Sequence, residues 1–193
     1  MTADAFALLG FPRRPWLDAA EVRERFIRAS AEVHPDRVHG VDAAARAAAQ
    51  DAYTALNAAQ RTLSSPRLRA EHLLELETGA KPAGIQRVPA DVMALFTDFA
   101  ALLRETDQHQ ARLAAATSPL VRAGHFAAGL ELTARLQAAL GRVQEFTARA
   151  QAALTALNPA WEAADPLAGE ARRAALPLAA LEEPFRRLAF LDR

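Results

Sequence analysis

Two matching apolar stripes on either side of a proline constrain this fold more than any other feature. Both stripes repeat at spacings of four, three and four residues: Val22, Phe26, Ala29 and Val33, then Ala52, Leu56, Ala59 and Leu63. This spacing places each set on one face of a helix. Pro35 disfavours helical geometry at His34, so the first helix must end near Val33. Two such helices with a short connection are predicted to pack as an antiparallel hairpin.

The remainder of the chain also favours helix. Alanine, the best helix former, occurs throughout, and no useful length of sequence alternates with a period of two. Asp18 and Ser65 are expected N-caps, and Gly79 is an expected C-cap. We therefore predict an all-α protein, with short helices over 4–10 and 67–77 beside the hairpin.

A change in composition at residues 79–88 predicts a linker, since glycines and a proline interrupt the helical pattern there. We expect an N-terminal domain over 1–78 and a C-terminal three-helix bundle over 89–193. Its helices are predicted to run from Pro89 to about Thr117, from Pro119 to about Leu157, and from Pro184 to Asp192. Asn158-Pro159 is expected to break the chain between the last two.

Composition excludes several classes of function. Lys and Arg total 23, as do Asp and Glu, so there is no basic excess typical of nucleic-acid binders. Cysteine is absent, which excludes a disulfide, a thiolate cluster ligand and a cysteine nucleophile. The histidines lack metal-ligand spacing, and no glycine-rich phosphate loop is present. We expect no cofactor, no metal site and no enzymatic activity of its own. Without a long apolar stretch or a basic leader, we expect no membrane contact and a cytoplasmic location.

The connection between the two striped helices carries the reactive side chains. It reads His34-Pro35-Asp36, followed directly by Arg37. The proline stiffens the loop, so an imidazole and a carboxylate are presented at little ordering cost on binding. Asp36 can accept a charge-assisted hydrogen bond from an arginine of a partner. The loop therefore indicates a protein-binding site.

Residues 4–79 resemble the J domain of the HscB (Hsc20) family, co-chaperones of iron–sulfur cluster assembly. The resemblance rests on residues spread over all the expected N-terminal helices: Phe6, Leu8, Gly10, Leu17-Asp18, Arg25-Phe26, His34-Pro35-Asp36-Arg37, Leu56-Asn57, Ala59, Thr62-Leu63, Pro66, Arg69-Ala70-Glu71 and Leu73-Leu74. The run Arg-Ala-Glu-His-Leu-Leu over 69–74 is more specific to that family than the loop tripeptide. Beyond residue 90 the resemblance is weaker.

This resemblance implies that the chain stimulates the ATPase of an HscA-like Hsp70 through His34, Pro35 and Asp36. Arg25, Arg28 and Arg37 become candidates for the basic surface that contacts the Hsp70. Glu21, Glu24 and Glu32 lie on the same helix, so the arginines of this helix also fit the description of ordinary solvated residues.

The resemblance also implies that the C-terminal domain binds an IscU-like cluster scaffold. The corresponding residues are hydrophobic: Val92, Met93, Phe96, Leu188 and Phe190. Thr97 and Ala100 stand where the family has glutamates, which leaves the electrostatic part of that contact open. Residues of this kind also fill bundle cores, so both interpretations of Val92, Met93 and Phe96 stand.

Two other functions fit the sequence. The chain could be a J-domain protein that regulates an Hsp70 with a different client, or none. It could also be a helical interaction module in which the His-Pro-Asp turn is inert.

Overall fold

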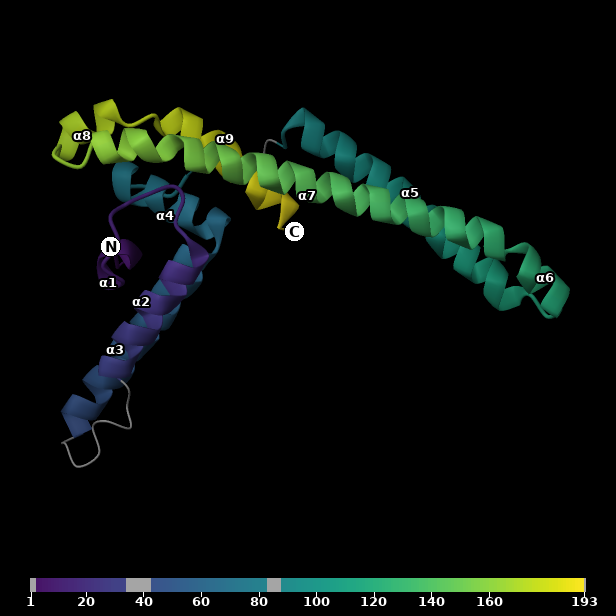
Figure 1. The fold of residues 1–193 in the computed structure, drawn as a ribbon, viewed down its shortest axis with the longest axis horizontal. Coiled ribbons are helices and arrows are strands. Elements are labelled where there is room, and N and C mark those ends of the chain that lie inside the picture. Colours follow the sequence, from purple (N-terminus) through teal and green to yellow (C-terminus); the bar gives the residue numbers. More distant parts are fainter. Residues whose placement is uncertain (1–2, 34–42, 83–87, 193) are drawn as a thin grey trace.

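A computed structural model of the chain describes residues 3–33, 43–82 and 88–192 (Figure 1). Within these residues the secondary structure is helical, without a strand, which confirms the predicted fold class. The helices are α1 (Ala5–Leu8), α2 (Ala19–Glu32), α3 (Ala43–Ser64), α4 (Pro66–Thr78), α5 (Ala90–Ala115), α6 (Pro119–Gly124), α7 (Phe126–Ala163), α8 (Gly169–Ala175) and α9 (Leu178–Leu191). No helix in these ranges is long and apolar enough to cross a membrane.

The predicted antiparallel hairpin is formed by α2 and α3 (Figure 1). Asp18 caps α2, and its carboxylate accepts hydrogen bonds from the backbone N–H groups of Ala20 and Glu21 at 2.8 and 3.0 Å. The two apolar stripes meet at the interface: Val22 of α2 and Leu63 of α3 are fully buried. Residues 34–42, which join the two helices, lie outside the described residues.

The Arg-Ala-Glu-His-Leu-Leu run lies in α4, where that helix meets α1 and the end of α3. The buried Arg69 guanidinium donates to the backbone carbonyl of Pro15 at 2.9 Å and to that of Leu63. Burial lowers the pKa of Arg69 to about 10. Nε2 of His72 accepts a hydrogen bond from the N–H of Ala5 at 3.0 Å. These side chains tie the opening segment to the hairpin.

Two prolines behave differently from the prediction. Asn158-Pro159 does not break the chain, because α7 continues through Pro159 to Ala163. The Asn158 side chain exchanges two hydrogen bonds of 3.0 Å with the backbone of Trp16, and Trp161 beyond it is fully buried. We attribute the continuous helix to these contacts, which offset the roughly 3 kcal/mol that an interior proline costs.

The boundaries of the last helices also differ from the prediction. Pro119 opens only the short helix α6, and the long helix α7 begins at Phe126. The final helix α9 begins at Leu178, six residues before Pro184, which lies inside it and is buried. Burial of the apolar face of α9 outweighs the hydrogen bond that this proline removes.

One hydrophobic core links the two ends of the chain. Phe6 of α1 and Leu73 of α4 belong to the same buried cluster as Leu154 and Trp161 of α7 and Phe185 of α9. α4 packs against α9, and α9 packs along the C-terminal half of α7 (Figure 1). The division into domains at 79–88 stays a prediction, since this core spans both proposed domains.

Beyond this core, α5 and the N-terminal half of α7 project as an arm with α6 at its tip (Figure 1). The seam between the two long helices contains Val92, Leu95 and Leu102, all buried. α5 and α9 therefore pack mainly against different stretches of α7.

Candidate protein-binding surfaces

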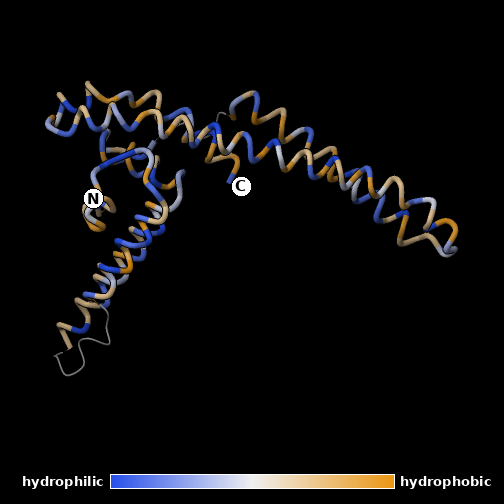
Figure 2. The backbone as a smooth tube through the Cα atoms, in the orientation of Figure 1, coloured by the Kyte–Doolittle hydropathy of each residue, from blue (hydrophilic) through white to orange (hydrophobic). Residues whose placement is uncertain are grey.

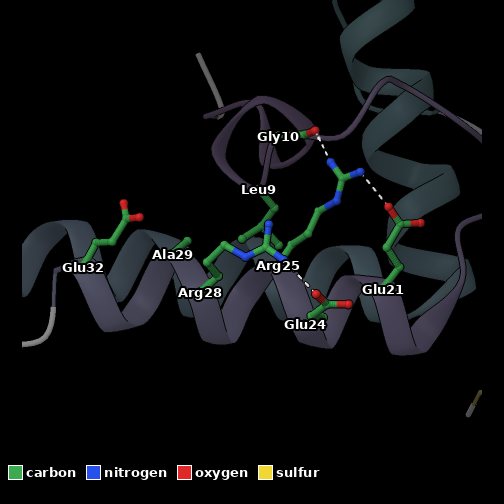
Figure 3. Close-up of a pocket in the computed structure, with 8 residues that line it drawn as sticks. All are labelled: Leu9, Gly10, Glu21, Glu24, Arg25, Arg28, Ala29 and Glu32. Carbon is green, nitrogen blue, oxygen red and sulfur yellow. Dashed lines mark hydrogen bonds and ion pairs between the residues drawn. The ribbon is translucent and has the colours of Figure 1, made fainter.

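One candidate surface is a hollow on α2, beside the turn that follows α1 (Figure 3). It encloses about 430 Å³. Its lining is mostly charged and comes from both segments: Leu9, Gly10, Glu21, Glu24, Arg25, Arg28, Ala29 and Glu32. The two arginines singled out in the sequence, Arg25 and Arg28, both line it, but they have different partners.

Arg25 is held by the protein itself. Its guanidinium donates to Glu21 at 2.6 Å and to the carbonyl oxygen of Gly10 (Figure 3). Its carbon Cζ lies 4.0 Å from the centre of the Phe11 ring. Gly10 has a φ of +67°, which favours glycine at this turn. Arg25 thus fastens the turn after α1 to α2.

Arg28 is the accessible cation of this pair. Its side chain is 70% exposed, and within the described residues it pairs with Glu24, one helical turn earlier, at 2.7 Å (Figure 3). An exposed pair of this kind contributes little to stability. Arg28 can therefore exchange Glu24 for an acidic partner at small cost.

The loop residues singled out in the sequence, His34, Pro35, Asp36 and Arg37, lie outside the described residues. The helix ends that flank them are described: α2 ends at Glu32 and α3 begins at Ala43. Both ends lie at the end of the hairpin remote from α4 (Figure 1). In the sequence the tripeptide falls between these two helix ends, and its role as a binding loop stays a prediction.

The hydrophobic residues proposed for scaffold binding divide into two groups. Val92, Leu188 and Phe190 are buried, with at most 5% of each residue exposed. Met93 and Phe96 are 50% and 38% exposed on α5. Only these two present substantial apolar surface to a partner, while the other three pack within the protein.

Two ion pairs that the sequence does not predict connect the N-terminal part of the chain to the region around α8. Arg172 holds the buried carboxylate of Glu77 through hydrogen bonds of 3.1 and 3.2 Å. Arg14 holds Asp165 at 2.5 and 3.0 Å. The residues of each pair are far apart in the sequence, and no local pattern relates them.

The described residues contain no group of three histidine, aspartate or glutamate side chains placed to hold a metal ion. The pKa shifts in the first helices have structural causes. Burial opposes ionisation of Asp4, but hydrogen bonds from Arg13 and from backbone N–H groups lower its pKa. Burial lowers the pKa of His72, against the raising influence of Asp4 and Glu75. Neither group lines the hollow on α2.

Comparison with known proteins bears on these surfaces. No family model matches the chain. Over 91 residues it is 37% identical to the co-chaperone protein HscB homolog of Chromobacterium violaceum, covering 47% of this chain and 52% of that protein. Over 72 residues it is 39% identical to the HscB homolog of Bordetella pertussis, covering 37% of this chain and 42% of that protein. Over these residues the chain is similar to HscB co-chaperones, the family that its sequence resembles.

The fold of HscB extends over almost the whole chain. Chaperone HscB from Vibrio cholerae superposes with a TM-score of 0.56 at 20% sequence identity, covering 98% of this chain and 91% of that one. This likeness concerns the fold alone. In sequence, the chain spans about half the length of the curated relatives it matches. What the HscB proteins do is therefore a proposal for this chain.

Proposed function

We propose that this protein is a J-domain co-chaperone of the HscB type, which stimulates the ATPase of an HscA-like Hsp70. The observation that carries the proposal is the α2–α3 hairpin, whose connecting segment contains His34, Pro35 and Asp36. The sequence similarity to HscB co-chaperones supports it. The chain would act as a regulator, without bond chemistry of its own.

The proposed contact has a stiff part and a charged part. The proline-restrained loop presents His34 and Asp36 to the Hsp70. Arg28, exposed on the α2 face, adds an ion pair with an acidic residue of the Hsp70. Arg25 serves indirectly, because it fastens the turn after α1 to the same helix. Binding at this surface would bias the Hsp70 toward its hydrolysis-competent arrangement.

The steady-state ATPase rate of the cognate Hsp70 tests the loop. We expect the full chain to raise this rate, and His34→Gln to abolish the increase. His39→Gln, a substitution of the same type in the same loop, should keep the increase. Absence of stimulation by the unaltered chain overturns the proposal, and so does equal stimulation by both variants.

The charged part is tested by reversing Arg28. Arg149 of α7 is a matched control, because its side chain is 72% exposed and pairs with Glu145 one turn earlier. Arg28→Glu should raise the concentration needed for half-maximal stimulation by about tenfold, as expected for a lost exposed contact that steers association. Arg149→Glu should leave it unchanged. If both variants change the half-maximal concentration equally, Arg28 has no specific role in binding the Hsp70.

We further propose that Met93 and Phe96 contact an IscU-like scaffold. Their exposure at the start of α5 supports this part of the proposal. Binding of purified scaffold to the full chain, measured by calorimetry, should weaken about tenfold in Phe96→Ala. Ile27→Ala, which truncates a 55% exposed residue of α2, serves as the control. If the unaltered chain binds no scaffold, the client is different, and the Hsp70 contact is then judged by the ATPase measurement alone.

A further inference from the structure

The projecting arm has two unlike flanks. Residues seven apart recur on one side of a helix. On one flank of the arm, Asp98 and Glu105 of α5 pair with Arg142 and Arg135 of α7 at 2.9 and 2.5 Å. These ion pairs cover one edge of the α5–α7 interface with charged side chains. That edge therefore requires no further helix to cover it.

The opposite flank is apolar. We call it the apolar flank, and define it by its large hydrophobic residues, each between 38% and 69% exposed: Phe96, Leu103, Leu113, Phe126, Leu130 and Leu140. Figure 2 shows apolar residues continuing along both helices of the arm toward its tip. By helical periodicity, the charged residues of α7 between 126 and 150 fall on the other side.

A hollow of about 450 Å³ opens on this flank near the tip. Phe126 and Leu130 are part of its lining, together with Thr106, His109 and Gly129. Gly129 helps to keep it open, since a Cβ there would approach Nε2 of His109 to 3.1 Å. The same surface therefore carries a cavity and exposed apolar side chains able to fill one.

We infer that the apolar flank is the interface of a homodimer, in which two arms pack as a four-helix bundle. A two-fold interface uses the same patch of both copies, so the hollow of each copy would face exposed apolar side chains of the other. The α7 side of the flank carries no charge, and the charged residues nearest to it are of opposite sign: Asp107, one turn from Leu103 on α5, and Arg122, at the hollow. Two helical hairpins with apolar flanks form a four-helix bundle on burial of those flanks.

The exposed area fits a second copy. Half-exposed leucine and phenylalanine residues present about 100 Å² each, so the six residues expose on the order of 600 Å² of apolar surface. This is at the upper end for the largest apolar patch of a monomer, about 300–600 Å². With polar neighbours at the rim, it approaches the roughly 800 Å² per partner of a standard interface. The inference does not rest on the proposed function, and because Phe96 belongs to both surfaces, a scaffold and a second copy would compete for it.

Sedimentation of the full chain over a range of concentrations tests the dimer. We expect a monomer–dimer equilibrium in the micromolar range, weakened at least about tenfold by Phe126→Glu, which buries a charge at the interface. Ala138→Glu places the same charge on an exposed site of α7 beside Arg135 and Arg142, on the charged flank, and should change nothing. Circular dichroism should show unchanged helix content in both variants. A chain that stays monomeric at high micromolar concentration, or a dimer unaffected by Phe126→Glu, overturns the inference.

The absence of native cysteine permits a second, independent test. A cysteine introduced as Leu130→Cys should form an intermolecular disulfide under mild oxidation, whereas Ala138→Cys, on the charged flank, should form far less. Equal cross-linking of both variants would indicate random collision and contradict the inference. Protection of Leu130→Cys from a thiol reagent only by added scaffold would also contradict it, because the occupant would then be a different protein.

Discussion

His72 is a residue whose protonation is coupled to folding. Its Nε2 accepts the Ala5 N–H at 3.0 Å, and its ring stacks on Phe6 with centroids 5.9 Å apart. Burial lowers its pKa, against Asp4 and Glu75, which raise it, while Arg13 lowers it. The unfolded chain therefore binds a proton at higher pH than the folded chain, and stability falls as pH drops below about 6.5.

The measurement is the free energy of unfolding by urea between about pH 7.5 and 5.5, a range spanning the ordinary histidine pKa. The unaltered chain should lose stability steadily as the pH falls. His72→Gln keeps an acceptor but cannot titrate, so its stability should be lower at pH 7 and change less across this range. An identical pH dependence in both proteins would assign the effect to other groups. Asp4 contributes in a separate, more acidic window, because its pKa is lowered.

At the scale of residues, sequence reasoning recognised the important run in α4 but not its physical role. The 69–74 run pointed to the HscB family, and the structure shows why its polar members matter: Arg69 and His72 bond backbone groups that lie 54 to 67 residues away. The stripe positions were predictable because helical periodicity is local. The partners of Arg69, Glu77 and Arg172 were not, since nothing local relates them.

At the scale of elements, the sequence correctly predicts prolines that begin a helix. It wrongly predicts a helix break where tertiary packing keeps the helix continuous. Ser65 caps α4 ahead of Pro66, accepting a hydrogen bond from Leu68 N–H at 3.3 Å. Pro159 is the contrary case. A local rule predicts a break, but contacts of α7 with a segment over 140 residues earlier in the chain hold the helix together.

Asn158→Ala tests that explanation. Its side chain now accepts from the N–H of Trp16 and donates to the carbonyl of Trp16, both at 3.0 Å. Removing both hydrogen bonds should lower the free energy of unfolding by about 1–3 kcal/mol. Gln151→Ala, at an exposed position on the same helix, should cost under about 0.5 kcal/mol. Equal costs, measured by urea unfolding, would show that Asn158 does not stabilise this part of α7.

At the scale of the whole molecule, the shared core predicts cooperative unfolding. Leu73 of α4 and Phe185 of α9 belong to one buried cluster. Neither the first four helices nor α9 keeps its buried surface if the other part unfolds. Calorimetry should therefore show one main transition for this core, with a calorimetric enthalpy close to the van't Hoff value. Two well-separated transitions, one for 1–78 and one for the remainder, would contradict this coupling.

The Glu77–Arg172 pair makes the same coupling testable at one contact. The Glu77 side chain is 4% exposed, and its carboxylate accepts hydrogen bonds from Arg172 at 3.1 Å and from Arg13 at 3.4 Å. Arg172→Ala leaves a buried carboxylate poorly compensated, so it should lower the free energy of unfolding by about 3 kcal/mol. Adding Glu77→Gln removes that charge and should recover part of the loss. Arg149→Ala breaks an exposed pair and should cost under about 1 kcal/mol. If Arg172→Ala costs no more than this control, the buried pair does not hold α4 to the C-terminal helices.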